Sequence, residues 1–276
     1  MDDAQYGNAR SPHVHRNRRG MSHAVGEMHM VDLHFHLLPG VDDGPAEMGD
    51  SIELARQAAA EGTDTVVATP HIRADFFTDV PTLPERLDEV RRALAEEGIP
   101  LELLCGGELG HDMVGRLDQS ELETIAQGPP GGRWLLVEAP FEGVGEDFHA
   151  ATAELRDRGF GVLVAHPERS ADAALDGAAG LRRELRLGAV AQINALSLDG
   201  RHGEDAERAG HSLLAEGLPA VIGSDAHGPT RPPALLAAAD VLCERGTSPA
   251  LARALTGSGP RALVARGLPS ASPLAA

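Results

Sequence analysis

The amino-acid sequence predicts an α/β barrel of about seven strand–helix units, with a functional site at the C-terminal ends of the strands. Short apolar runs alternate with helix-like patterns from residue 30 onward, which is typical of repeated βα units. The runs are apolar almost throughout, as expected for parallel strands that are buried on both faces. Polar residues of metal-binding type follow six of these runs, whereas a doubly wound open sheet would gather them at one switch point. A closed barrel therefore fits better than an open sheet.

The expected strands are seven short apolar runs, at residues 31–33, 65–68, 101–105, 134–137, 161–165, 189–193 and 220–222. The segments between them have apolar residues at helical spacing, which predicts helices at residues 51–60, 83–96, 148–158, 181–187, 205–215 and 232–245. A last helix, at residues 249–263, is expected to pack over the base of the barrel.

Local signals mark where these helices begin and end. Asp50 is the expected N-cap of the first helix, and Glu53 three residues later would complete a capping box. Glycines are expected to end four of the helices in the left-handed conformation. They are Gly62, Gly98, Gly159 and Gly217.

One domain is expected, because the candidate ligands run from His34 to His227 and a boundary between them would split the site. Residues 30–265 are assigned to this domain. Residues 1–29 are polar and without periodicity, which predicts a disordered leader or sequence upstream of a start at Met28 or Met30. Residues 266–276 are expected to be a flexible tail.

Composition excludes several classes of protein. Hydrophobic residues make up 42% of the 276 residues, enough for a core, and the formal net charge is −18. An acidic surface argues against binding to nucleic acid or anionic lipid. No apolar run approaches the length of a membrane span or signal-peptide core, so a cytoplasmic protein without membrane insertion is expected. Cys105 and Cys243 form no CxxC pattern, which argues against a disulfide framework or a thiolate zinc site.

The residues that carry chemistry begin with His34 and His36, which end the first apolar run. Alternate side chains of a strand point to the same face, so the two imidazoles can bind one ion together. The remaining candidates follow later runs or lie in the loops after them. They are Asp43, His71, Glu108, Glu138, His166, Asp225 and His227.

Each candidate alone has a structural explanation, such as a helix N-cap at residues 224–227. Core packing does not explain why so many of them follow strands. Imidazole and carboxylate ligands without thiolate suit Mn, Fe or Zn. Nine candidates would be enough for about three ions. The sequence therefore predicts a polynuclear metal site at the mouth of the barrel.

These motifs resemble the PHP (polymerase and histidinol phosphatase) superfamily over residues 30–245. Within it they are most similar to bacterial capsular-polysaccharide tyrosine-protein phosphatases of the CpsB/CapC type. The sequence HxHxLPGxDDG at residues 34–44 is highly specific for this subgroup, whereas the HPER and GSDAH sequences are shared more widely. The matching segments are residues 32–44, 68–71, 106–108, 136–138, 165–169 and 223–227. The resemblance implies a distorted (β/α)7 barrel of PHP type.

The resemblance also implies a site of three ions, with Mn²⁺ expected and Fe or Zn as alternatives. The first ion would be bound by His34, His36, Glu108 and Asp225, the second by Glu108, Glu138 and His166, and the third by Asp43, His71 and His227. Clustered cations would neutralise a phosphate and lower the pKa of a bound water.

Four residues are expected to act on the substrate. Arg169 would bind phosphoryl oxygens as a bidentate fork, and Arg231 is a second candidate. His227 or Asp43 could protonate the leaving group. Each arginine also has a structural alternative, as a surface ion pair.

The function implied is a metal-dependent phosphoric monoester hydrolase of the protein-tyrosine-phosphatase type. Its expected partner is the phosphorylated tail of a bacterial tyrosine autokinase that controls capsular or exopolysaccharide synthesis. Three alternatives stay open: a PHP phosphoesterase for a small metabolite such as a histidinol-phosphate-like or nucleotide monoester, a metal-dependent amidohydrolase, and a non-catalytic binding platform. Arg73 and Ser170 depart from the family pattern and put the choice of substrate in doubt.

Overall fold

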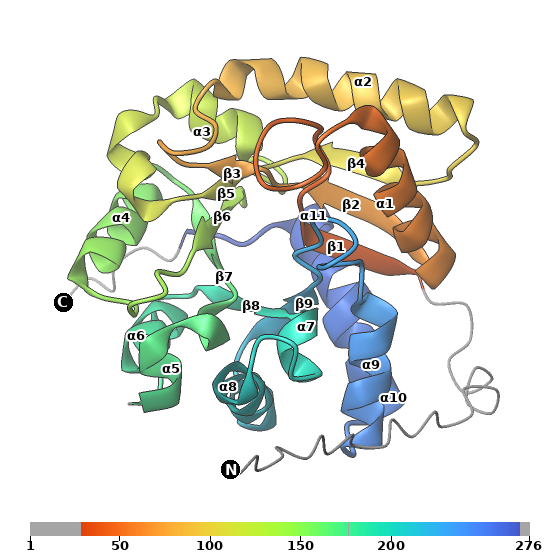
Figure 1. The fold of residues 1–276 in the computed structure, drawn as a ribbon. Helices are drawn as coiled ribbons and strands as arrows, with labels where there is room; N and C mark the ends of the chain where they lie inside the picture. Colours follow the sequence, from red (N-terminus) through yellow and green to blue (C-terminus); the bar gives the residue numbers. More distant parts are fainter. Residues whose placement is uncertain (1–28, 176, 271–276) are drawn as a thin grey trace, which may run out of the picture.

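Parallel strands form two adjoining sheets in the computed structural model, which describes residues 29–175 and 177–270. The strands are β1 (Met30–Phe35), β2 (Thr63–Ala68), β3 (His71–Ile72), β4 (Glu102–Cys105), β5 (Glu108–Leu109), β6 (Trp134–Glu138), β7 (Gly161–Ala165), β8 (Val190–Asn194) and β9 (Ala220–Gly223). One sheet has the order β1-β2-β4 and the other the order β3-β5-β6-β7-β8-β9. Helices surround the strands (Figure 1).

The two sheets together make one closed barrel. β3 continues β2 after two residues, and β5 continues β4 after Gly106 and Gly107. If each interrupted strand is counted once, the described part of the chain has the predicted seven strands. The ends meet where Phe35 pairs with Ala226, and the amide of Asp225 donates to the carbonyl oxygen of His34 at 2.9 Å. The predicted barrel is confirmed.

The interruption of β4 requires glycine. A Cβ atom on Gly106 would lie 2.5 Å from Cγ1 of Val67, and one on Gly107 would lie 2.7 Å from Cγ1 of Ile72. Both separations are shorter than a side chain tolerates, so the neighbouring strands can approach this closely only at glycine.

Eleven α-helices lie in the described segments. They are α1 (Met48–Glu61), α2 (Leu83–Glu96), α3 (Gln119–Ile125), α4 (Glu146–Asp157), α5 (Ala171–Leu175), α6 (Ala179–Arg186), α7 (Ala195–Leu198), α8 (Glu204–Ala215), α9 (Leu235–Glu244), α10 (Pro249–Arg253) and α11 (Gly259–Arg266). Six predicted helices correspond to α1, α2, α4, α6, α8 and α9. The predicted helix at residues 249–263 corresponds to α10 and α11, which a π-helical segment at Ala254–Ser258 joins. The short helices α3, α5 and α7 were not predicted, because so few turns leave no clear periodicity.

The predicted start of the first helix is wrong. Glu47 is the N-cap, and Asp50 is the third residue of α1, where it completes a capping box with Glu47. Glu47 and Asp50 have the same spacing as Asp50 and Glu53, so spacing alone does not distinguish the two boxes. The four predicted glycine ends are confirmed, with φ between 67° and 97° at Gly62, Gly98, Gly159 and Gly217.

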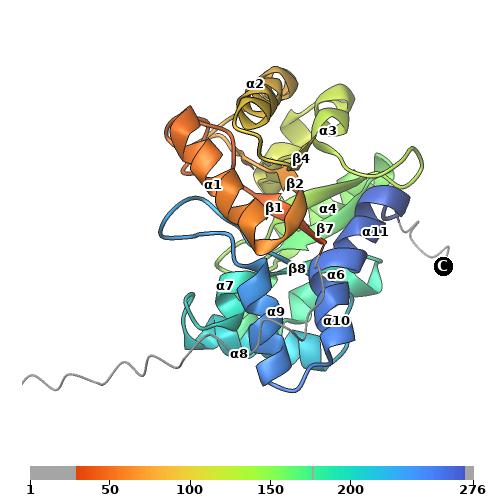
Figure 2. The ribbon, with the colours of Figure 1, turned by 90° about the vertical axis from the view of Figure 1, so that its right-hand side faces the viewer.

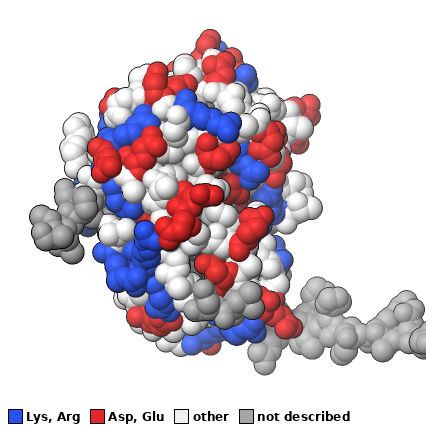
Figure 3. Space-filling view, turned by 90° about the vertical axis from the view of Figure 1, so that its left-hand side faces the viewer, with Lys and Arg blue, Asp and Glu red and all other residues white. Residues whose placement is uncertain are grey.

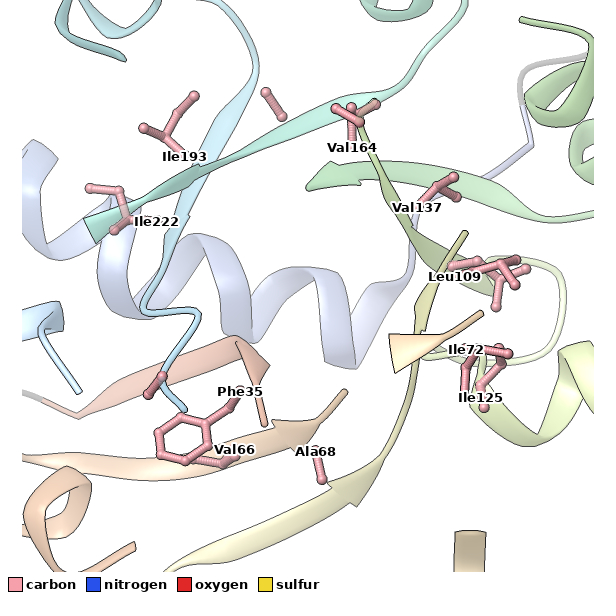
Figure 4. Packing of buried hydrophobic residues seen from close by; sticks show 14 of the residues in the cluster. Phe35, Val66, Ala68, Ile72, Leu109, Ile125, Val137, Val164, Ile193 and Ile222 are labelled. Atoms are coloured by element: carbon pink, nitrogen blue, oxygen red, sulfur yellow. The ribbon is translucent and has the colours of Figure 1, made fainter. Parts of the chain in front are cut away.

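Two layers of apolar side chains hold the barrel together. The interior is filled from alternate strand positions, by Val31, Leu33, Val67, Trp134, Leu136, Leu163, Ala165 and Val221. A larger cluster packs the outer faces of the strands against the helices, and Figure 4 shows members of it on strands around the barrel. Trp134 donates through Nε1 to the carbonyl oxygen of Leu263 at 2.9 Å. The C-terminal helix therefore closes the base of the barrel, as predicted (Figure 2).

Acidic and basic side chains are interspersed over the face drawn in Figure 3. All 24 basic side chains of the sequence are arginine. None of the described helices combines the length and the apolar character that a membrane span needs. Most of the predicted leader, residues 1–28, and most of the predicted tail, residues 271–276, lie outside the described residues.

Glu61, the last residue of α1, gives a test of the fold by pH. Burial raises the pKa of its carboxyl to about 7, although a backbone hydrogen bond from Leu236 acts in the opposite direction. The folded state therefore binds more protons than the unfolded state between pH 4.5 and 7, and stability falls as pH rises through this window. We expect Glu61→Gln to raise the free energy of unfolding at pH 8 by about 1 kcal/mol, allowing for solvent screening.

At pH 4 we expect Glu61→Gln to leave the free energy of unfolding unchanged, because the wild-type carboxyl is then protonated and resembles the glutamine amide. Denaturant unfolding at both pH values measures the difference. A glutamine variant that was equally or less stable at pH 8 would show that the buried charge costs nothing here.

Candidate metal centre

The structure brings all nine predicted ligands to one end of the barrel. Every one lies at the C-terminal end of a strand or in the segment that follows it. They come from β1 and its loop (His34, His36, Asp43), β3 (His71), β5 (Glu108), β6 (Glu138), the end of β7 (His166) and the segment after β9 (Asp225, His227). Eight are buried, and Asp43 is 42% exposed in its side chain. This is the end at which barrels of this class carry their sites.

The side chains of β1 do not alternate regularly between the two faces of the strand near the site. Its pairing with β2 shifts register between Asp32 and Phe35. Leu33 packs in the interior cluster but Phe35 packs in the outer one, although strict alternation would put both on one face. The irregularity lets His34 and His36 both face the mouth while Phe35 packs outward.

Glu108 lies at the centre of the cluster. Its Oε2 is 3.2 Å from Nε2 of His34, 3.3 Å from Nε2 of His36 and 2.9 Å from Nδ1 of His71. Its Oε1 is 2.8 Å from Nε2 of His166. A carboxylate with partners on both oxygens can bridge two ions.

The ligand atoms fall into four overlapping groups, each within 4.8 Å, and Glu108 belongs to two of them. The groups are His36, Asp43, His71 and His227; His34, His166 and Asp225; His34, His36 and Glu108; and His71, Glu108 and Glu138. The arrangement differs in detail from the three sets implied by the resemblance. His71 lies beside Glu108 and Glu138 as well as beside Asp43 and His227.

The residues fit divalent ions. Among the candidate ligands, four buried atoms lie close to other ligands but form no hydrogen bond of normal geometry, namely Nδ1 of His71, Oε2 of Glu108, Nδ1 of His166 and Nε2 of His227. Unpaired polar atoms are costly in a protein interior. Ligation of these atoms by cations would remove that cost, and the imidazole and carboxylate donors match the preferences of Mn, Fe and Zn.

Protons compensate the carboxylates in the absence of ions. Burial alone would lower the pKa of His34, but Glu108 and Asp225 beside it raise that pKa to about 9. Burial would likewise raise the pKa of Glu108, but His34 and His71 hold it well below its usual range. Divalent cations would displace such protons on binding.

A second layer of polar side chains orients the ligands. Nδ1 of His36 lies 2.6 Å from Oδ2 of Asp42, which also accepts from the amide of His71 at 2.9 Å. On β8, Oε1 of Gln192 lies 2.8 Å from Nδ1 of His34, and Asn194 donates to Asp225 at 2.8 Å. Gln192 and Asn194 were missed, although two polar residues at alternate positions of an apolar run were a usable signal.

Asp42→Asn tests this second layer. The amide would keep the size of the side chain but weaken its hydrogen bond to His36. We expect affinity for Mn²⁺ to fall by about 10- to 100-fold. Competitive metal titration of the purified protein gives the affinity, with Asp147→Asn, at an exposed position of α4, as the matched control. Equal affinities of the two variants would contradict an orienting role.

A cavity of about 500 Å³ opens over the cluster. Besides candidate ligands, its lining consists of Arg73, Phe76, Phe141, Arg169, Leu196, Arg201, His202, Thr230 and Arg231. The non-ligand charges in this lining are all positive at neutral pH, which suits an anionic substrate.

The predicted arginines reach this cavity. Arg169 donates to Oδ2 of Asp225 at 3.1 Å, and Arg231 to Oδ2 of Asp43 at 2.6 Å. Arg73 donates to Oε2 of Glu138 at 2.9 Å. Each of these three guanidiniums forms an ion pair with a candidate metal ligand at the cavity, so none of them is paired only with acidic residues of the outer surface. Ser170, the second departure from the family pattern, is buried and donates to the carbonyl oxygen of Pro140 at 2.6 Å.

The sequence prediction missed Phe141, Arg201 and His202. Phe141 lies in the loop after β6, whereas Arg201 and His202 lie in the turn between α7 and α8. No local pattern distinguishes the three from ordinary loop residues. Burial, followed by the charge of Arg169, lowers the pKa of His202 to about 4. Its imidazole is therefore neutral at pH 7.

The comparisons with known proteins agree with this geometry. The family model for capsular polysaccharide synthesis proteins of the CpsB/CapC type matches residues 30–264. The tyrosine-protein phosphatase YwqE of Bacillus subtilis is 31% identical over 199 residues, 72% of this chain and 77% of the relative. The putative tyrosine-protein phosphatase CapC of Staphylococcus aureus is 31% identical over 210 residues, 75% of this chain and 80% of the relative.

Solved structures support the same assignment. A structure from a study of YwqE from Bacillus subtilis and CpsB from Streptococcus pneumoniae, described as unique metal-dependent tyrosine phosphatases, aligns with a TM-score of 0.76 and 28% identity. The alignment covers 90% of this chain and 100% of that one. The phosphotriesterase homology protein from Escherichia coli, at a TM-score of 0.58 and 14% identity, shares the fold alone. By fold, site geometry and sequence, the chain belongs to the CpsB/CapC family of capsular polysaccharide synthesis proteins.

Proposed function

We propose that this protein is a metal-dependent protein-tyrosine phosphatase. Relatives at 31% identity bear the name tyrosine-protein phosphatase. The observation that carries the proposal is the convergence of five histidines and four carboxylates on Glu108 and its neighbours, beneath a cavity lined with arginine. A phosphate monoester is the anion that such a site suits.

We propose that the nine residues bind three divalent ions, with Mn²⁺ as the first candidate. Glu108 is the expected bridging ligand, because both of its oxygens face imidazoles of the cluster. When bound, the ions would supply the positive charge that neutralises a phosphate and lowers the pKa of water at the site.

The arginines are proposed to bind the phosphoryl oxygens. Arg169 has its guanidinium 5.0 Å from the centre of the Phe141 ring, which orients its planar fork at the cavity. Arg231 lies across the same cavity beside Asp43. A guanidinium pair would hold the phosphate in one orientation for attack on phosphorus.

The surroundings of His227 and Asp43 favour metal binding over acid catalysis. Burial lowers the pKa of His227, and neighbouring His36 acts in the same direction. Burial would raise the pKa of Asp43, but His227, Arg231 and His71 hold it below its usual range. Both shifts favour the less protonated form of the side chain, the neutral imidazole of His227 and the carboxylate of Asp43, and these are the forms that bind metal ions. A tyrosyl oxygen is a good enough leaving group to depart without their help.

The amidohydrolase alternative is less well supported. Such enzymes usually place a lysine at a central strand end, and this sequence contains no lysine. The likeness to solved phosphotriesterase and dipeptidase structures, at 14% identity, concerns the fold only.

The proposed substrate is the phosphorylated, tyrosine-rich tail of a bacterial tyrosine autokinase in the cytoplasm, with a role in capsule or exopolysaccharide synthesis. The family model, which describes capsular polysaccharide synthesis, supports this choice. Purified protein with Mn²⁺ is expected to release phosphate from phosphotyrosine peptides faster than from histidinol phosphate or a nucleoside monophosphate. The reverse order would assign the protein to metabolite phosphoesterases.

A further inference from the structure

Two phenylalanine rings stand exposed at the mouth of the cavity. Phe76 is 40% exposed and Phe141 is 47% exposed, and both line the cavity. In the described part of the chain the other exposed large hydrophobic side chains are Leu187, at 37%, and Leu251, at 50%, and neither lines the cavity. Single exposed apolar residues need no explanation, but two at one cavity point to an apolar group on the ligand.

The two rings pack on histidines that contact different oxygens of Glu108. Phe76 stacks on His71 with ring centroids 4.8 Å apart and an interplanar angle of 19°. Phe141 is nearly parallel to His166, at 6.2 Å and 10°. His71 contacts Oε2 of Glu108 and His166 contacts Oε1. Each ring therefore lies beside a different candidate metal ligand.

Neighbouring groups hold both rings in place. The guanidinium carbon of Arg73 lies 5.7 Å from the centre of the Phe76 ring, and that of Arg169 lies 5.0 Å from the centre of the Phe141 ring. The carbonyl oxygen of Phe141 accepts from the amide of Ala171 at 2.8 Å, and the amide of Phe76 donates to the carbonyl oxygen of Arg73 at 3.1 Å. Rings fixed in this way are ready to bind a ligand without further ordering.

We propose that Phe76 and Phe141 form an aromatic clamp that selects aryl over alkyl phosphate monoesters. The clamp rests on the proposed phosphatase function and adds the residues that would determine its preference for an aryl ester. In an aryl phosphate one oxygen separates phosphorus from the ring, so a phosphate over the ligand cluster puts the ring at the level of the two phenylalanines. Aromatic rings favour stacked or edge-to-face contact. A phosphoserine side chain has no ring to fill this space.

The test compares two peptides of one sequence, carrying phosphotyrosine or phosphoserine, on the manganese-loaded protein. The variants are Phe76→Leu, Phe141→Leu, the double variant and Phe141→Tyr, with Leu251→Ala as an exposed control outside the cavity. The double leucine variant is expected to lose about tenfold or more in kcat/KM on phosphotyrosine, mainly through KM. Its loss on phosphoserine should be several-fold smaller than its loss on phosphotyrosine, so that the preference for phosphotyrosine falls, and Phe141→Tyr should keep the preference. Equal losses on both peptides, or no loss on phosphotyrosine, would overturn the clamp.

A binding measurement separates the clamp from the proposed function. Calorimetric titration with phenylphosphonate and methylphosphonate needs no hydrolysis. The wild type is expected to prefer the phenyl compound, and the double variant to lose that preference. The clamp is refuted if the wild type binds the two phosphonates equally well, or if the double variant still prefers the phenyl compound. If the wild type hydrolyses neither peptide, the phosphatase proposal fails, while the phosphonate titrations still decide whether the rings bind an aryl group.

Discussion

Replacing Glu108 with glutamine is expected to lower kcat/KM on a phosphotyrosine peptide by at least about 10³-fold, because this carboxylate would help to hold the cations whose charge stabilises the transition state by several kcal/mol. Glu108 is fully buried and contacts imidazoles through both oxygens. An amide has only one acceptor oxygen and no charge, so it cannot bridge cations. The metal content of the variant is expected to fall as well, as measured by elemental analysis.

The matched control is Glu102→Gln, which lies on β4, the other part of the same interrupted strand, and is exposed. It is expected to keep full activity and metal content. Circular dichroism and thermal melts establish whether each variant folds. A folded Glu108→Gln protein that kept both metal and activity would show that this carboxylate does not bridge ions.

Replacing Arg169 with alanine is expected to lower kcat/KM by about 10²- to 10³-fold, the usual effect of removing a donor that stabilises transition-state charge. The guanidinium lies at the cavity with Asp225 and Phe141 on either side. Arg169→Lys should recover only part of the loss, because an ammonium cannot bind two phosphoryl oxygens as a fork.

Metal content distinguishes this role from a merely structural one. Arg169→Ala should keep the metal of the wild type, and added guanidinium should restore part of its activity. Arg56→Ala on α1, an exposed arginine paired with Glu53 and Glu97, is the control. If Arg169→Ala lost its metal in parallel with activity, the arginine would be a support for the metal cluster and not a phosphate ligand.

Much of the fold and site could be predicted because parallel barrels place strand ends together. His34, Glu138 and His166 are distant in sequence, but each ends or follows an apolar run, so the topology itself brings them to one mouth. The glycines at helix ends were predictable for a different reason, because local backbone geometry alone decides which residue can end a helix in the left-handed conformation.

The rest depends on contacts that the sequence does not encode locally. The register shift in β1 and the close approach at Gly106 depend on neighbouring strands. Phe141 and His202 reach the cavity through loops, where no periodicity marks direction. His71 lies beside two parts of the cluster because β3 resumes only after a break in the strand, so the division of ligands among ions could not be read from spacing.

The most direct test measures the metal content of the purified protein by elemental analysis, together with phosphate release from a phosphotyrosine peptide before chelation, after it and after Mn²⁺ is restored. We expect about three divalent ions per chain, loss of activity with their removal and recovery on their return. Undiminished activity in protein stripped of metal, or loaded protein inert toward phosphotyrosine, would contradict the proposed function.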